Sequence, residues 1–261
     1  MWHVLSGWLG ARGRRPPSPL YAIPEGQRVY AVGDIHGLDA LLADLLERIT
    51  ADIADAPSHV TLLFIGDYID RGPASKQVLE RLGNLNFPAN VATVFLRGNH
   101  EQALLEFLAD PVARPDWLGW GGEETLASYG IRLHAPDGRL RTPAALAAEL
   151  DEALAANNHK VFLQSTKLLH RQGDYLFVHA GVRPSVPLHR QLESDLLFIR
   201  EGFVGRPHGL PCRVVYGHTM VAEPLVLPDR IAIDTGAYTG GPLTAAVLEE
   251  EDVRFLQVQG G

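Results

Sequence analysis

The chain has 261 residues, of which 46% are hydrophobic and 21% charged, values typical of a globular protein with a sizeable core. Its net charge of −8 argues against nucleic-acid binding, which requires a surface rich in Lys and Arg. No apolar run reaches the roughly 18 residues of a transmembrane helix, and Cys212 is the only cysteine, which excludes an intrachain disulfide and fits a reducing, cytoplasmic location.

The first 27 residues differ in composition from the rest of the chain. Gly10–Pro19 is rich in Gly, Arg and Pro, and its arginines follow the short apolar stretch Met1–Leu9, the reverse of the order in a signal peptide. We therefore expect residues 1–27 to form a flexible arm, with a weak membrane or partner anchor as the alternative. Residues 28–261 are expected to form a single domain.

One pattern then recurs three times: a short apolar run ends in glycine and polar residues, and helical periodicity follows. The three polar clusters are GDIHG at Gly33–Gly37, GDYIDRG at Gly66–Gly72 and GNHE at Gly98–Glu101. Strand, loop and helix in succession predict parallel strands with crossover helices. Ligand chemistry collects at the carboxyl ends of such strands, and all three clusters fall there.

Residues 101–164 are predicted to be mainly helical. Thr142 followed by Pro143 is a good helix start, because Pro suits the first helical position and Thr the cap. The segment Trp117–Gly122 is interpreted as a rigid loop between helices, and we expect it to line the approach to a site.

The second half contains short apolar runs separated by turns, and these predict strands. They cover Tyr175–Val178, Arg213–Tyr216, Arg230–Ile233, and Leu243–Leu248 with Val253–Val258 as a hairpin. An α/β first half and a β-rich second half predict two mixed sheets packed face to face with helices outside. The expected fold is thus a four-layer αββα sandwich, with residues 101–164 as a helical insertion.

Six residues at or just after predicted strand ends have side chains that can hold metal ions: Asp34, His36, Asp67, Asn99, His179 and His218. Carboxylates and amides suit hard cations and imidazole suits transition metals, so the mixed set favours manganese, with iron or zinc as alternatives. A lone Asp after a strand is usually a turn or cap residue. The recurrence of the pattern after five apolar runs argues for two divalent ions, with Asp67 as a carboxylate able to bridge them.

The three long motifs, in this order, resemble the core signature of PPP-type serine/threonine phosphatases of the calcineurin-like metallophosphoesterase superfamily. HAG at His179–Gly181 and YGH at Tyr216–His218 match the two later histidine motifs of that family. The resemblance extends from about Val29 to Gly236. The size of the chain is similar to that of bacterial or phage members.

The resemblance implies an α/β sandwich with two metals between the sheets. Asp34, His36 and Asp67 would bind the first ion, and Asp67, Asn99, His179 and His218 the second. His100 would be the general acid, held by Asp70. The phosphate would be bound by Arg71, by Asn99 and by Arg200, which lies in LLFIRE.

The expected activity is that of a metal-dependent protein phosphatase acting on phosphoserine or phosphothreonine in proteins or peptides. Two divalent ions would bind a bridging hydroxide, the nucleophile, and neutralise the phosphoryl oxygens. The leaving alkoxide needs a proton, which His100 would supply. The resemblance does not extend to regulatory subunits or toxin sensitivity, because the tyrosine-bearing loop and tail of eukaryotic members have no counterpart in this sequence.

The alternative within the superfamily is a dinucleoside-polyphosphate hydrolase that cleaves diadenosine tetraphosphate. Such enzymes typically carry another residue at the position of Asp70, and GNHD where this chain has GNHE. Both local features favour the protein-phosphatase branch. Arg71 argues against broader metallophosphoesterases that act on nucleotides or phosphodiesters, and a non-catalytic binding module is disfavoured because every predicted site residue is present.

Overall fold

The computed structural model describes residues 21–260. None of the helices in this part of the chain combines the length and apolar character that a membrane span requires. Residues 1–20 of the predicted arm lie outside the described residues. The arm and the division of the chain into domains therefore stay predictions.

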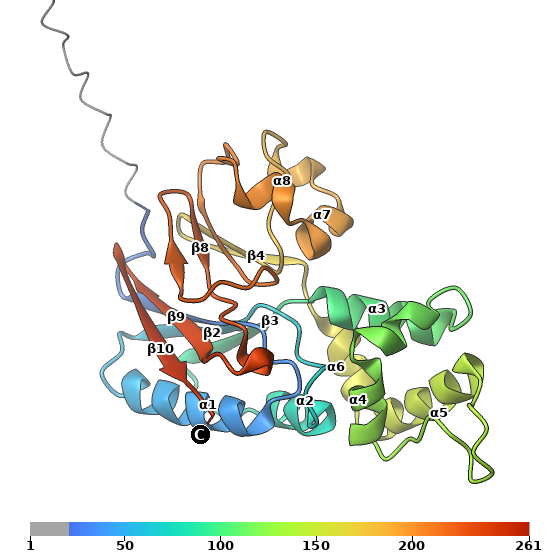
Figure 1. Cartoon of the computed structure of the whole chain (residues 1–261). Coiled ribbons are helices and arrows are strands. Elements are labelled where there is room, and N and C mark those ends of the chain that lie inside the picture. The colour runs from blue at the N-terminus through green and yellow to red at the C-terminus, as the bar shows by residue number, and fades with distance from the viewer. Residues whose placement is uncertain (1–20, 261) are drawn as a thin grey trace, which may run out of the picture.

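The chain order follows the predicted alternation in the first half (Figure 1). The first half contains β1 (Gln27–Val32), α1 (Asp39–Ile53), β2 (His59–Phe64), α2 (Ser75–Gly83), β3 (Val91–Phe95), α3 (Asn99–Ala109), the 3-10 helix η1 (Pro115–Trp120), α4 (Gly122–Ser128), α5 (Pro143–Ala156) and α6 (His159–Ser165). The second half contains β4 (Leu169–Gln172), β5 (Tyr175–Val178), η2 (Leu188–Arg190), α7 (Glu193–Phe198), α8 (Glu201–Val204), β6 (Arg213–Tyr216), β7 (Leu225–Val226), β8 (Arg230–Ala232), η3 (Ala237–Thr239), β9 (Leu243–Glu249) and β10 (Asp252–Val258).

These strands form two five-stranded sheets, in the orders β10-β9-β1-β2-β3 and β4-β5-β6-β8-β7. In the first sheet β1, β2 and β3 are parallel, and β9 and β10 are antiparallel to their neighbours. In the second sheet β5, β6 and β8 are parallel, and β4 and β7 are antiparallel edge strands. Both sheets are mixed, as predicted.

The alternation of side chains along β1 shows how the layers arise, because successive residues of a strand point to opposite faces. Val29 and Ala31 belong to an apolar cluster that also includes Phe177 and Ile231 of the second sheet. Tyr30 and Val32 belong to the cluster that packs under the helices α1 and α2. A third cluster joins the outer face of the second sheet to α7 and α8. The predicted four-layer αββα sandwich is confirmed.

The predicted helical middle of the chain contains α3 to α6, which lie beside the sandwich in Figure 1. The Thr142 hydroxyl accepts a hydrogen bond from the backbone N–H of Ala145, so Thr142 caps α5 where the sequence predicted a helix start. The segment Trp117–Gly122, expected to be a loop, instead contains most of η1 and the start of α4.

Two strands, β4 and β7, were not predicted. Each lies at an edge of the second sheet, where it has a single neighbour. The sequence of β4 is LHRQ and β7 has only two, exposed residues, so neither shows the apolar run that identifies a buried strand.

The parallel strands bring six loops to one edge of the sandwich. Asp34 follows β1, Asp67 follows β2 and Asn99 follows β3, while His179 follows β5 and His218 follows β6. The two sheets meet there, because the Nδ1 of His179 hydrogen-bonds the carbonyl oxygen of Ile65 at 3.0 Å. The loop after β8 reaches the same edge. The fold therefore collects the predicted polar residues between the ends of two sheets.

Candidate active site

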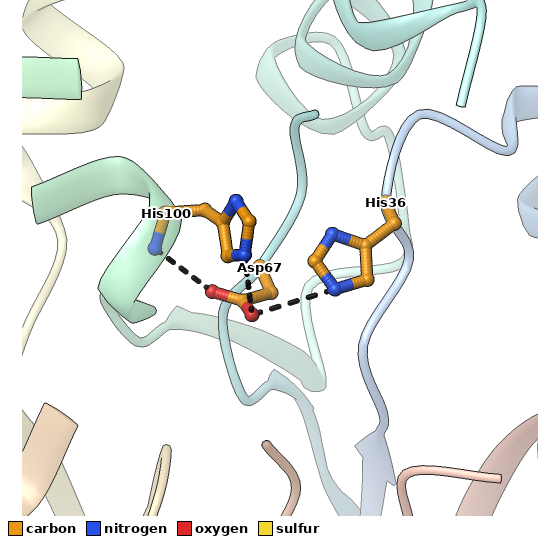
Figure 2. Close-up of side chains that lie close together, drawn as sticks. All are labelled: His36, Asp67 and His100. Atoms are coloured by element: carbon orange, nitrogen blue, oxygen red, sulfur yellow. Dashed lines mark hydrogen bonds and ion pairs between the residues drawn. The ribbon is translucent and has the colours of Figure 1, made fainter. Parts of the chain in front are cut away.

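Asp67 lies at the centre of the cluster, and its carboxylate faces two sides. Its Oδ2 is 3.5 Å from Nε2 of His36 and 3.9 Å from Nε2 of His100 (Figure 2). Its Oδ1 is 3.4 Å from Nε2 of His179. Among the described residues, the donor atoms of His36, Asp67 and His100 form one group within 4.8 Å, and those of Asp67, His179 and His218 form another. One carboxylate thus joins two donor groups, as a bridging ligand would.

His36 and His179 are oriented in the same way. The Nδ1 of His36 lies 3.0 Å from the carbonyl oxygen of Ile69, and that of His179 lies 3.0 Å from the carbonyl of Ile65. A carbonyl can only accept, so each Nδ1 carries the proton and each neutral ring presents the lone pair of Nε2 to Asp67. Histidines that bind metals are commonly held by such a hydrogen bond on the other nitrogen.

The protonation of these rings suits a metal site. Burial lowers the pKa of His36 and of His218 to about 3 and also lowers the pKa of His179, so all three are neutral at physiological pH. Burial opposes ionisation of Asp67, but the surrounding histidines His179, His100 and His36 hold its pKa below its usual value.

Two further observations indicate that a cation fits. The Nε2 of His218 is buried and has no hydrogen-bond partner among the described residues. The Nε2 of His179 lies 2.9 Å from Oδ1 of Asn99 and 3.4 Å from Oδ1 of Asp67. The lone pair of Nε2 and these two oxygens are all acceptors, so they converge without a donor between them. Buried polar atoms without partners are costly, and a divalent ion would satisfy them. The donor set of oxygen and imidazole suits such an ion.

Asp34 lies beside this cluster rather than within either of the two donor groups. Its carboxylate oxygens accept the backbone N–H of His218 at 3.0 and 3.3 Å. Burial, together with the carboxylates of Asp234 and Asp67, raises the pKa of Asp34 well above its usual value. A bound cation would relieve this repulsion. The assignment of Asp34 to the first ion stays a prediction.

The backbone of the site is strained. Five of the eight non-glycine residues with positive φ between residues 21 and 260 are site residues: His36, Asp67, Asp70, Arg71 and His218. Positive φ is unfavourable for residues with a side chain and is tolerated where the surrounding structure fixes it. The concentration of such residues indicates that these side chains are held in position for a function.

His100 and Asp70 form a hydrogen-bonded pair. The Nδ1 of His100 lies 2.7 Å from Oδ2 of Asp70, and the Nη2 of Arg71 lies 3.1 Å from Nε2 of His100. Asp70 is fully buried and accepts from Nε1 of Trp117 at 2.9 Å and from the hydroxyl of Thr125 at 2.6 Å. Burial and Arg71 lower the pKa of His100, but Asp67 and Asp70 raise it overall. The balance favours the protonated form that a general acid needs, once Nε2 no longer accepts a hydrogen bond from Arg71.

The arginines predicted to bind phosphate lie in the same cavity, which has a volume of about 870 Å³. Arg71 extends over the ring of Tyr238, with its guanidinium carbon 4.2 Å from the ring centroid. Arg200 donates from Nη1 to the carbonyl oxygen of His218 at 2.9 Å. Asn99 and His100 also line this cavity. The structure therefore brings the predicted phosphate-binding and catalytic residues together, while their roles stay predictions.

Glu101 has a structural role that its motif did not reveal. Its Oε2 accepts the backbone N–H groups of Asp67 and Gly98, and its Oε1 accepts that of Tyr68, each at 2.8 Å. Glu101 thereby fixes the turn that carries Asp67 and the start of α3. It is fully buried and contacts backbone rather than the cavity.

We expect Glu101→Asp to lower the free energy of unfolding by about 2–4 kcal/mol, since a side chain shortened by one methylene loses part of these charge-assisted hydrogen bonds. Thermal melting of the wild type and the variant measures this. The ratio of activities on a dinucleotide and a phosphopeptide should not change. A switch of preference towards the dinucleotide would show that Glu101 selects the substrate.

Three other residues of the site were missed by sequence reasoning, and a fourth has a role that differs from the expected one. Asp234 follows the apolar run of β8, so the rule that found Asp34 and Asp67 could have found it. Tyr238 follows in the same loop, and its ring centroid lies 5.0 Å from that of His36. A tyrosine thus lies at the site, although none was predicted there. Thr125 had no signal in sequence, because it reaches Asp70 only through the folding of the insertion. Trp117 belongs to the segment expected to line the approach, but it is buried and donates to Asp70, while Trp120 of the same segment lines the cavity.

Comparison with known proteins agrees with this geometry. Residues 27–256 match the family model of calcineurin-like phosphoesterases. Bis(5'-nucleosyl)-tetraphosphatase PrpE (asymmetrical) of Bacillus cereus strain ATCC 10987 / NRS 248 is 29% identical over 241 residues, which cover 82% of this chain and 87% of the relative.

Solved structures show the same fold. One, described as a candidate diadenosine tetraphosphatase, has a TM-score of 0.60 and 24% identity, with 92% of this chain and 99% of that one covered. A cold-active protein-tyrosine phosphatase of a psychrophilic Shewanella species has a TM-score of 0.56 and 17% identity, with coverage of 95% and 87%.

Proposed function

The chain belongs to the calcineurin-like phosphoesterase family, and from this premise we propose that it is a metal-dependent hydrolase of dinucleoside tetraphosphates. The observation that carries the proposal is the similarity to asymmetrical bis(5'-nucleosyl)-tetraphosphatases along most of both chains. Asymmetrical cleavage of a tetraphosphate bridge yields a nucleoside monophosphate and a nucleoside triphosphate. This function is the alternative that was considered from the sequence, where the local motifs favoured a protein phosphatase.

The two local features that favoured a protein phosphatase lie outside the cavity and so would not contact a substrate directly. Asp70 and Glu101 are both fully buried. Asp70 holds His100, and Glu101 holds the backbone around Asp67. Neither side chain lines the cavity. A different residue at either position would therefore change how His100 and Asp67 are held in place, and would not change a direct contact with the leaving group.

The proposed site assigns a task to each group. Asp34, His36, Asp67, Asn99, His179 and His218 would hold two divalent cations. When bound, these would lower the pKa of water and neutralise phosphoryl charge. Arg71 and Arg200 would bind the phosphoryl oxygens through their planar guanidinium groups. His100, with Asp70 fixing its tautomer, would be the proton donor for a basic leaving oxygen such as an alkoxide, whereas the weakly basic leaving phosphate of a dinucleotide would need this proton much less.

A phosphoprotein phosphatase is the second candidate. The observation that favours it is the short hydrogen bond between His100 and Asp70, 2.7 Å long, because a strongly held general acid is most valuable for a poor leaving group such as a serine alkoxide.

Parallel assays of the manganese-loaded protein test the proposal, using diadenosine tetraphosphate, a phosphoserine peptide and a phosphotyrosine peptide. We expect kcat/KM for the dinucleotide to be the highest by at least roughly tenfold, a difference of about 1.4 kcal/mol in transition-state stabilisation. AMP and ATP should form in equal amounts. A higher kcat/KM for a phosphopeptide would overturn the proposal in favour of the second candidate.

A further inference from the structure

The cavity at the site is larger than phosphate binding requires. Its volume of about 870 Å³ lies within the range of roughly 300–1,000 Å³ found for pockets that hold a whole drug-sized ligand. Its polar part contains the arginines Arg71 and Arg200. Its apolar part contains Leu118 and Trp120 of the helical insertion and Phe198 at the end of α7. The cavity therefore offers an apolar part beside the arginines that are predicted to bind phosphate.

Trp120 is held in a fixed position relative to the phosphate-binding residues. On one side, the buried Trp117 anchors η1 by donating from Nε1 to Asp70. On the other side, Gly121 has φ +107° and packs so closely that an added Cβ would lie 2.3 Å from the backbone nitrogen of Arg71. The N–H of Arg71 also donates to the carbonyl oxygen of Gly121 at 3.3 Å. The indole is thus positioned by the residues that position Arg71.

The surroundings of the indole leave it open towards the cavity. The guanidinium carbon of Arg114 lies 5.2 Å from the Trp120 ring centroid, over one face. Arg114 is held there by Glu106 at 2.7 Å and Asp116 at 3.1 Å. The ring centroid of His100 lies 6.1 Å from that of Trp120. The indole therefore lies next to the proposed proton donor and lines the cavity.

The charges around this apolar part of the cavity select the kind of group that it accepts. Glu123 and Glu124 are exposed and line the same cavity as Trp120. Two carboxylates repel phosphates, whereas Arg71 and Arg200 attract them. A ligand that carries both a phosphate and a neutral planar ring is thus oriented with its phosphate at the arginines and its ring at Trp120. A nucleoside monophosphate has this composition.

We propose that Trp120 is a specificity-determining residue that stacks the nucleobase attached to the phosphate under attack. This inference rests on the proposed function, since it concerns the nucleotide part of the same substrate. Stacking on an indole uses the face of any base, so this contact discriminates base-bearing substrates from base-free ones rather than one base from another.

Kinetics on two substrates test the role of Trp120. For the manganese-loaded protein, kcat/KM is measured with diadenosine tetraphosphate and with inorganic tripolyphosphate, which has no base. We expect Trp120→Ala to lower the ratio of kcat/KM for the dinucleotide to kcat/KM for tripolyphosphate by roughly 5- to 150-fold. This is the range that base stacking on an aromatic side chain supports. Trp120→Phe keeps a ring and should retain most of the ratio. Val112→Ala, at an exposed residue of the same insertion, is the control.

Binding of products separates this inference from the proposed function. Titration calorimetry gives the affinities of AMP and of inorganic phosphate for the manganese-loaded wild type and for Trp120→Ala. We expect the wild type to bind AMP more tightly and the variant to lose that preference, whichever substrate is hydrolysed fastest. Equal affinities for AMP and phosphate in the wild type, or an AMP preference that survives in Trp120→Ala, would overturn the role of Trp120.

Discussion

Replacing Asp67 by Asn is expected to reduce bound metal from two ions to fewer than one and to lower kcat/KM by at least roughly 10³-fold. A metal ion contributes several kcal/mol to the stabilisation of charge in the transition state, and each 1.36 kcal/mol that is lost lowers the rate about tenfold. The reason lies in the geometry of one carboxylate. Its Oδ2 faces His36 and its Oδ1 faces His179, so removal of its charge weakens both donor groups at once.

Elemental analysis of the purified variant measures the metal content, and steady-state kinetics with added Mn²⁺ measures activity. Asn retains an oxygen that can accept the backbone N–H of His100, as Oδ1 of Asp67 does at 3.1 Å, so we expect the fold to persist. Asp137→Asn, which removes an exposed carboxylate outside the site, serves as the control. Full occupancy by two ions in Asp67→Asn would show that this carboxylate does not bridge them.

The second large effect is expected from His100→Asn, and it depends on the leaving group. With a phosphoserine peptide, loss of the general acid should lower kcat by roughly 10²–10⁴-fold. With diadenosine tetraphosphate the loss should be below about tenfold, because the leaving phosphate is a weak base with a pKa near 6 and departs without a proton at neutral pH. Metal content should stay at the wild-type value if His100 acts as an acid.

The test measures kcat of the variant with each of the two substrates and the metal content of the purified variant. The companion variant Asp70→Asn should show the same dependence on substrate, since the carboxylate of Asp70 holds the ring of His100 at 2.7 Å. Equal losses on both substrates would contradict proton transfer to the leaving group. Loss of metal in His100→Asn would instead assign His100 to the donor group that it forms with His36 and Asp67.

Much of the fold could be predicted because its signals are local. The strands β1, β2 and β3 are short apolar runs that end in glycine, and the start of α5 is marked by Thr142 and Pro143. Patterns of this kind reflect the burial of a face and the capping of a helix, which depend on neighbours in sequence. The edge strands β4 and β7 lack such a signal because edge strands are only partly buried.

For the substrate class, the local motifs and the similarity to known proteins favour different candidates. Asp70 and Glu101 belong to motifs of a phosphatase, and the sequence alone cannot show that both are buried supports. The residue that we propose to contact the base of the substrate lies in the insertion: the ring centroid of Trp120 is 6.1 Å from that of His100. The spacing of tryptophans and glycines at Trp117–Gly122 did not indicate that Trp117 is buried and that Trp120 lines the cavity.

The sequence by itself determined the chemistry of the donors and the edge at which they gather, since each follows an apolar strand and parallel strands end together. The tertiary structure alone decided how the donors pair. It placed the two oxygens of Asp67 on opposite sides and turned the free nitrogens of His36 and His179 towards them. It also set Trp117 and Thr125 against Asp70. These contacts join positions from 31 to 112 residues apart, so only the packing of two sheets and an insertion could fix them.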